Sequence, residues 1–263
     1  MSDDGHTVGV DLFGAAVGWE SLPAGSIVLC ATHGHPEHCG SFAELLRNAD
    51  PERLKATHLL SSPDVVDPIL DQSPLPAGNA HGVAAGGSVS LEGVRISTFS
   101  WQHLPILPPE SLAAKAEYAK QLSRHPIEAA RIAFSALRLP MQAPYLGFHI
   151  TLPSGLKILN YSEGLHRMTN ASEVTSVAEA LPADVVMLAV EPEDTEAIPR
   201  WIEILSPSTV IIYEAHRPWR EMFELPYVDL ADYAETLGKD LPGIRVEALI
   251  EPGDRVDVAK AGG

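Results

Sequence analysis

Cysteine and basic residues are scarce in this chain of 263 residues, and long apolar runs are missing. Two cysteines, Cys30 and Cys39, make no disulfide framework, so they predict small buried thiols in a reducing compartment. No run approaches the ~18 apolar residues of a bilayer-spanning helix. The opening "MSDDGHTVG" is acidic and polar, unlike a secretory leader. We therefore expect a cytoplasmic protein that has no membrane partner.

The shortage of basic residues also bears on the partner. Lys and Arg number 18 against 35 Asp and Glu, which gives a formal net charge of −17. A nucleic acid requires a basic face, and an anionic membrane surface would be repelled by this charge. A small anionic substrate stays possible, because a bound metal can reverse the local field. The composition therefore favours a small-molecule substrate.

The pattern of apolar runs predicts a single α/β domain over residues 1–263. Short β-branched runs bounded by turn residues predict strands at 26–32, 94–101, 147–152, 156–161, 184–190, 209–214 and 244–250. Helical patterns occur at 40–48, 109–124, 126–138, 171–181 and 195–205. Pro-Ser-Gly between 152 and 156 predicts a hairpin turn, so the sheets are expected to be mixed.

The segment 105–145 is expected to be a helical insertion between strands. It either covers the functional site as a lid or packs elsewhere as an ordinary helix pair, and the sequence favours neither. Tyr118, Arg124 and Arg131 lie on these predicted helices, and any of them could reach a substrate. Most of them are expected to be ordinary surface residues.

Histidines and carboxylates gather after the predicted strands. "THGHPEH" places His33, His35, Glu37 and His38 directly after the strand 26–32. His103, Glu163 and His216 each lie two residues beyond the end of another predicted strand. Unpaired buried polar groups are costly, so these side chains should converge on something that compensates their desolvation. Imidazole and carboxylate are ligands of zinc, iron and manganese, and strand ends are where layered α/β proteins bind ligands.

Other histidines and one acidic segment are predicted to lie outside the site. His6, His58, His81 and His125 are expected at the surface or in loops. His149 and His166 could support a metal ligand or contact the substrate, but an ordinary structural role is favoured for both. The acidic residues of 191–200 precede a predicted helix, where they would suit the helix dipole without binding an ion.

The motif "THGHPEH" resembles the His-x-His-x-Asp-His signature of metallo-β-lactamase-fold hydrolases. The later order of His, acidic residue and His is similar to the remaining ligands of that superfamily. The hairpin "YLGFHITLPSGLKILNYSEG" most resembles its ascorbate-6-phosphate lactonase-like branch, and the resemblance covers roughly residues 9–220.

This resemblance implies an αββα sandwich, in which two mixed sheets are flanked by helices, with two divalent metal ions at one edge. His33, His35 and His103 would hold one ion, Glu37, His38 and His216 the other, and Glu163 would bridge them. Zinc is the expected metal, with manganese or iron as alternatives. A hydroxide bound by both ions would attack a small ester, lactone or phosphodiester, and Glu37 or His216 would move the proton to the leaving group.

The chain departs from the family pattern in three ways. Glu37 and Glu163 each replace an aspartate, and the usual N-terminal β-hairpin looks missing or truncated. An exposed sheet edge could then be covered by a second copy of the chain. The two longer carboxylates also suit a di-iron, oxygen-dependent enzyme on the same fold. A third possibility is a non-catalytic metal-binding scaffold.

Overall fold

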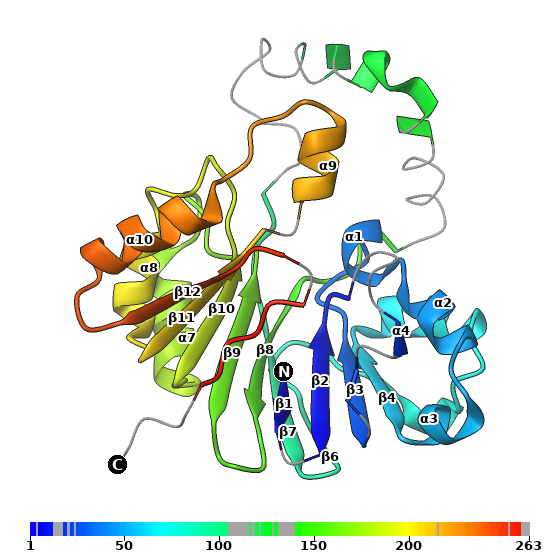
Figure 1. The fold of residues 1–263 in the computed structure, drawn as a ribbon. Helices are drawn as coiled ribbons and strands as arrows, with labels where there is room; N and C mark the ends of the chain where they lie inside the picture. Colours follow the sequence, from blue (N-terminus) through cyan, green and yellow to red (C-terminus); the bar gives the residue numbers. More distant parts are fainter. Residues whose placement is uncertain are drawn as a thin grey trace.

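A computed structural model describes residues 1–3, 5–12, 18–19, 22–23, 25–104, 116, 119–120, 122–127, 129–130, 140–214, 216–251 and 253–258; the side chains at 37, 218, 219 and 222 are outside this description. Two mixed sheets lie face to face, and helices cover their outer surfaces (Figure 1). The predicted αββα sandwich is confirmed. Within the described residues, no helix is long and apolar enough to cross a bilayer.

The first sheet has the order β1-β2-β3-β4-β5. Its strands are β1 (Ser2–Asp3), β2 (His6–Val10), β3 (Ser26–Cys30), β4 (Thr57–Ser61) and β5 (Ala80–Gly82). Strands β2 to β5 are parallel, and β1 pairs antiparallel with β2. The N-terminal hairpin is therefore present in a short form, with a first strand of two residues. β1 therefore forms the edge of the first sheet next to β2, where the sequence predicted an exposed edge.

The second sheet has the order β12-β11-β10-β9-β8-β7-β6. Its strands are β6 (Ser88–Leu91), β7 (Val94–Ser100), β8 (Leu146–Thr151), β9 (Lys157–Ser162), β10 (Val185–Ala189), β11 (Thr209–Tyr213) and β12 (Arg245–Leu249). Strands β6 to β9 alternate in direction, whereas β9 to β12 are parallel. The predicted hairpin at Pro-Ser-Gly joins β8 to β9, and Gly155 supplies the positive φ that the turn requires.

Helices cover the outer face of each sheet (Figure 1). On the first sheet they are α2 (Phe42–Arg47), α3 (Pro51–Lys55) and α4 (Pro63–Asp71), and on the second α7 (Ala171–Ala180), α8 (Ile198–Leu205) and α10 (Leu230–Asp240). The short helices α1 (Pro36–Cys39) and α9 (Arg217–Met222) lie at one edge of the sandwich, and a 3₁₀ turn spans Ala77–Asn79. Asp50, Asn170 and Asp229 cap the starts of α3, α7 and α10 through backbone N–H groups. Pro51 is the first residue of α3, a position where its missing N–H costs no hydrogen bond.

Three apolar clusters bind these layers together. One lies between the two sheets and includes Val28, Phe148 and Ile150. A second packs α7, α8 and α10 on the second sheet around Trp201, and a third packs α2 and α4 on the first sheet around Phe42. Each sheet thus buries both of its faces, which fits the nearly continuous apolar runs of the parallel strands.

Most of the predicted insertion at 105–145, including Tyr118 and Arg131, lies outside the described residues. Its described part is partly helical and contacts the segment after α9 through side chains. Arg124 Nη1 lies 3.6 Å from Glu224 Oε2, and the ring of His125 packs edge-on against Phe223. Both interpretations of the insertion, a lid over the site and an ordinary helix pair, stay predictions.

Candidate metal centre

The site residues come from strand ends that meet at one edge of the sandwich. His33 follows β3, His103 follows β7, Glu163 follows β9 and His216 follows β11, all at carboxyl ends. Strands β7, β9 and β11 run in the same direction in the second sheet. A hydrogen bond from Leu146 N to Thr32 O, 2.8 Å long, joins the end of the first sheet to the same edge. The topology therefore brings His33, His103, Glu163 and His216 to the same edge of the sandwich.

The histidine motif occupies a tight loop before α1. His35 occupies the N-cap position of α1, so His38 lies inside the short helix, whereas His33 and His35 lie in the preceding loop. A Cβ at Gly34 would lie 2.2 Å from Pro140 O, so glycine is required where these two backbones approach. His33, His35 and His38 are all at least 96% buried. Glu37 belongs to α1, but its side chain is outside the described part of the chain.

Four of the imidazoles are held through Nδ1. His33 Nδ1 lies 2.9 Å from Thr32 Oγ1, and His38 Nδ1 lies 3.0 Å from Asp11 Oδ2. His103 Nδ1 contacts the Leu104 carbonyl oxygen, and His216 Nδ1 lies 2.6 Å from Glu191 Oε1. This anchoring leaves Nε2 as the atom that faces the cluster, as in protein metal sites where a second contact fixes the ring.

Glu163 lies at the centre of this arrangement. Its Oε1 is 2.9 Å from His38 Nε2 and 3.4 Å from His216 Nε2, while its Oε2 is 2.9 Å from His103 Nε2. The carboxylate is thus surrounded by imidazoles from three segments of the chain. A buried carboxylate in this position requires a positive partner, which either imidazolium or a metal dication supplies.

Two groups of potential ligand atoms fit the size of an ion site. His33, His35 and His103 offer atoms within 4.8 Å of one another, and so do His33, His38 and Glu163. His33 belongs to both groups, and its Nε2 has no hydrogen-bond partner among the described residues. The residues present therefore fit one or two metal ions. A metal ion would give the buried Nε2 of His33 a partner, and none of the described contacts gives it one.

The electrostatics follow from burial and from the central carboxylate. Burial and the neighbouring His38 lower the pKa of His33 well below its ordinary value, so its ring is neutral. Burial also disfavours charge on His38, but the carboxylates of Glu163 and Asp11 raise its pKa to about 10. Burial opposes ionisation of Glu163, yet His216 and His38 hold its pKa well below the usual range. His33 is therefore neutral and Glu163 ionised, the states in which each binds a metal, whereas His38 would have to lose its proton on binding one.

The backbone is distorted where two strands reach the site. Asp11, directly after β2, and Ser162, at the end of β9, both adopt positive φ, at 51° and 50°. The register between β9 and β10 shifts at Met187 and Leu188, next to Ser162. Such irregularities redirect a side chain, here that of Glu163, and the surrounding contacts must stabilise them.

Asp11 supplies several of those contacts. It accepts hydrogen bonds from Thr32 N and Thr32 Oγ1, each 2.8 Å, and from Ser162 Oγ at 3.3 Å. It also contacts His38, so one carboxylate joins the ends of β2, β3 and β9 to the histidine motif. Sequence reasoning missed this residue. The signal was available, because Asp11 is a carboxylate that directly follows an apolar run, like the predicted site residues.

Solved structures show which known fold this arrangement resembles. No family model and no curated protein matches the chain. CmlA, a diiron β-hydroxylase from Streptomyces venezuelae, superposes with a TM-score of 0.54 at 14% identity, over 88% of this chain and 45% of CmlA. The metallo-β-lactamase fold protein YhfI from Bacillus subtilis superposes with a TM-score of 0.50 at 10% identity, over 86% of this chain and 75% of YhfI.

The chain has the metallo-β-lactamase fold. At identities of 10% and 14% the similarity concerns the fold alone. The chain also spans less than half the length of CmlA. Membership of the ascorbate-6-phosphate lactonase-like branch stays a prediction.

In this fold an aromatic wall adjoins the first group of ligands. The ring of Tyr145 lies 5.1 Å from that of His33 and 5.0 Å from that of His103, measured between centroids. Trp101 lies 5.6 Å from His33 and stacks on His103. A Cβ at Gly164 would come within 2.9 Å of Trp101, so this glycine allows the loop after Glu163 to pack on the wall. Burial, and more weakly Glu163, raises the pKa of Tyr145, which keeps its hydroxyl protonated.

The acidic residues of 191–196 precede α8, as predicted, and two of them have side-chain partners. Helix α8 has Ala197 as its N-cap and no acidic residue in its first turn. Glu191 contacts His216 and Arg220, and Asp194 pairs with Arg167 at 3.0 Å. These two carboxylates therefore face cationic and imidazole partners of neighbouring segments, and the effect of the helix dipole stays a prediction.

The histidines predicted to lie outside the site have other partners among the described residues. His149 Nε2 lies 3.1 Å from Pro182 O, and His166 Nε2 lies 2.7 Å from Gln102 O, the residue before His103. His58 and His81 contact each other on β4 and β5.

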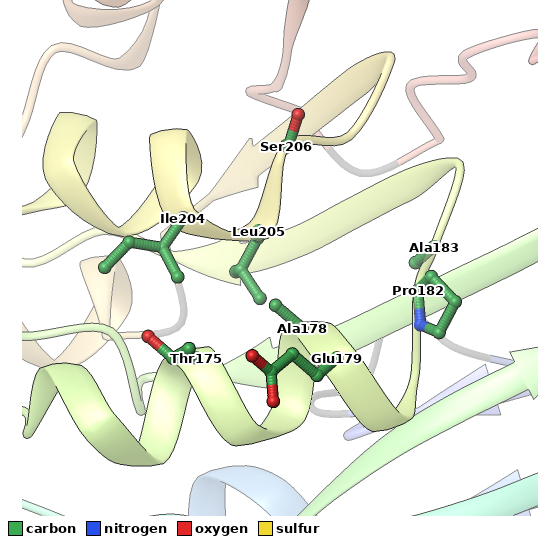
Figure 2. Close-up of a pocket in the computed structure, with 8 residues that line it drawn as sticks. All are labelled: Thr175, Ala178, Glu179, Pro182, Ala183, Ile204, Leu205 and Ser206. Atoms are coloured by element: carbon green, nitrogen blue, oxygen red, sulfur yellow. The ribbon is translucent and has the colours of Figure 1, made fainter.

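A hollow of about 450 Å³ between α7, α8 and the start of β10 lies at the other end of the second sheet (Figure 2). Glu179 is its one ionisable lining residue among those described, so it offers no comparable chemistry.

Proposed function

We propose that this protein is a metal-dependent hydrolase with a dinuclear centre, acting on a small ester, lactone or phosphodiester. One observation carries the proposal: imidazole Nε2 atoms of His38, His103 and His216 converge on the buried carboxylate of Glu163, while their Nδ1 atoms are anchored away from it. An arrangement that serves structure alone would not need so many imidazoles on one carboxylate.

The ligands divide into two sets in this proposal. His33, His35 and His103 would hold the first ion, and their ligand atoms lie within 4.8 Å of one another. His38 and His216, with Glu37, would hold the second. Glu163, which contacts His103 on one oxygen and His38 on the other, would bridge the two sets. Zinc suits these nitrogen-rich sets, and manganese or iron are the alternatives.

The chain's own groups would bind and orient the substrate. Ions bound here would supply Lewis acidity and lower the pKa of a coordinated water. The wall of Trp101 and Tyr145 would exclude water from one side, and the protonated Tyr145 hydroxyl would donate a hydrogen bond to the substrate. His216, or Glu37, would carry a proton to the leaving group. The net charge of −17 favours a small substrate over a polyanion.

A di-iron, oxygen-dependent enzyme is the second candidate. Glu37 and Glu163 stand where the family has aspartate, and this favours the second candidate. Carboxylates are common iron ligands, and the longer glutamate side chain gives them more freedom to coordinate it. CmlA, which shares the fold, is a diiron enzyme. The two candidates use the same ligands and differ in the metal that the protein takes up.

Elemental analysis of the purified full chain, with a visible absorption spectrum, separates the two candidates. We expect a colourless protein that retains zinc and cleaves at least one of three probes: a p-nitrophenyl ester, a γ-lactone or bis-p-nitrophenyl phosphate. A double variant, His33→Ala with His35→Ala, should retain no metal and no turnover. Hydrolysis by this variant at the wild-type rate would contradict the proposal. Iron with visible absorption would favour the oxygen-dependent enzyme, and two ions without any turnover would favour a binding scaffold.

A further inference from the structure

Glu191 and Arg220 form an ion pair directly behind His216. Glu191 Oε1 lies 2.6 Å from His216 Nδ1, and Glu191 Oε2 contacts Arg220 Nη2. The side chains of His216, Glu191 and Arg220 are exposed by 18%, 14% and 13%. The three groups thus form a chain of charged contacts that is largely removed from water, where such contacts are stronger than at the surface.

The fold brings these residues together from two neighbouring strands. β10 and β11 are parallel, with Ala189 opposite Tyr213, so Glu191 and His216 leave the same sheet edge side by side. Arg220 follows His216 by one helical turn, and its backbone N–H donates to His216 O at 2.8 Å. Residues four apart on a helix share a face, so Arg220 and His216 both reach Glu191.

Arg220 is anchored by further contacts. Its guanidinium lies 3.0 Å from Glu193 Oε2 and donates to Pro226 O at 2.7 Å. Glu193 is 51% exposed, so Glu191 is the more buried of its two carboxylate partners. A guanidinium held in a fixed plane orients a carboxylate better than a flexible ammonium would.

We propose that Glu191, fixed by Arg220, is a positioning residue for His216. It would hold the Nδ1 proton and the ring plane, and so direct Nε2 toward Glu163 and the second ion. This inference rests on the metal centre of the proposed function and adds two residues that neither the motif nor the ligand set contains. Carboxylates that bind the outer nitrogen of a metal-ligating histidine typically contribute about 10- to 100-fold in metal affinity.

Matched variants of the full chain test this role. Glu191→Ala removes the contact, Glu191→Gln keeps the shape and an acceptor oxygen without the charge, and Glu193→Gln alters the other partner of Arg220. Co²⁺ is the probe: its affinity is measured by competition with a chelator, and its visible spectrum reports ligand geometry. The Nδ1–H proton resonance of His216, assigned by its loss in His216→Gln, gives a readout that requires no metal.

We expect Glu191→Ala to weaken the binding of one Co²⁺ by about 10- to 100-fold and to abolish the Nδ1–H resonance. Glu191→Gln should shift the resonance and give a smaller loss, and Glu193→Gln should change neither. Wild-type affinity and resonance in Glu191→Ala would overturn the inference, as would equal losses in Glu191→Gln and Glu193→Gln. If the wild-type chain binds no metal, the proposed function fails, and the proton resonance alone decides on Glu191.

Discussion

His38 and His58 illustrate two environments for the same side chain in one molecule. His38 lies at the carboxyl edge of the first sheet, with Asp11 3.0 Å from Nδ1 and Glu163 2.9 Å from Nε2. His58 lies on β4, where its Nδ1 is 3.1 Å from Nε2 of His81 on β5. The carboxylates raise the pKa of His38 to about 10, whereas burial lowers the pKa of His58.

The difference lies in the partners. His38 is bound on both nitrogens by carboxylates, which orient the ring and favour its charged or metal-bound forms. His58 and His81 share one contact between two imidazoles, and no carboxylate fixes either ring among the contacts described. Histidine content alone therefore does not mark a site, whereas the carboxylates around a histidine do.

The largest effect should come from removing the central charge. We expect Glu163→Gln to lower metal affinity by more than about 100-fold and to abolish turnover, because three imidazoles would lose their shared anionic partner. Elemental analysis after dialysis against chelator measures the loss. Glu173→Gln, at an exposed position on α7, is the control and should behave as wild type. Full metal retention by Glu163→Gln would remove Glu163 from the ligand set.

A smaller effect is expected one contact further out. Asp11→Asn keeps an acceptor for Thr32 N but loses the negative charge beside His38. Metal affinity should fall by about 10- to 100-fold while the fold persists. Asp3→Asn is the matched control, because Asp3 accepts a 2.9 Å hydrogen bond from Ser154 N away from the site. Equal affinities of both variants, measured by chelator competition, would show that Asp11 does not support the centre.

The loop that carries the histidines should be sensitive to a single methyl group. Gly34→Ala would place a Cβ 2.2 Å from Pro140 O, so the backbone must move. We expect a loss of about 1–3 kcal/mol in the free energy of unfolding and a weaker first ion site. Gly78→Ala, where a Cβ meets nothing within 4 Å, should be neutral or slightly stabilising. Urea unfolding of the two metal-free variants compares them, and equal stabilities would contradict the close approach.

Much of the second sheet could be predicted because most of its strands are apolar, β-branched runs bounded by clear turn residues. The predicted runs at 94–101, 147–152, 156–161, 184–190, 209–214 and 244–250 correspond to β7 to β12. Other elements were missed. β5 has three residues and β1 has two, and such lengths carry too little pattern to be recognised. The strands β2, β4 and β6 and the helices α3, α4, α9 and α10 also went unrecognised.

The candidate site could be predicted in part for a topological reason. His33, His103, Glu163 and His216 follow strand ends, and parallel strands bring their ends together. Asp11, Glu191 and Arg220 were missed because their roles depend on which loops face each other. The sequence shows Glu191 as one acid among several, and the fold places it 2.6 Å from His216. The placement of the Glu37 side chain and of Tyr118 and Arg131 lies outside the described residues.

The smallest effect is expected at the His58–His81 pair and concerns pH. Burial lowers the pKa of His58 and, with His58 nearby, that of His81, below the value of 6.5 for an unfolded chain. Protonation therefore favours the unfolded state, and stability should be lost as the pH falls below 6.5. His58→Gln should reduce the drop in Tm between about pH 7.5 and pH 5, by no more than about 4 °C because both rings are partly exposed to water. Metal content should be unchanged, which separates this pair from the centre at the other end of the strands. If the drop in Tm of His58→Gln equals that of the wild type, the acid sensitivity of the protein arises elsewhere. If His58→Gln loses metal, the His58–His81 pair and the metal centre are coupled.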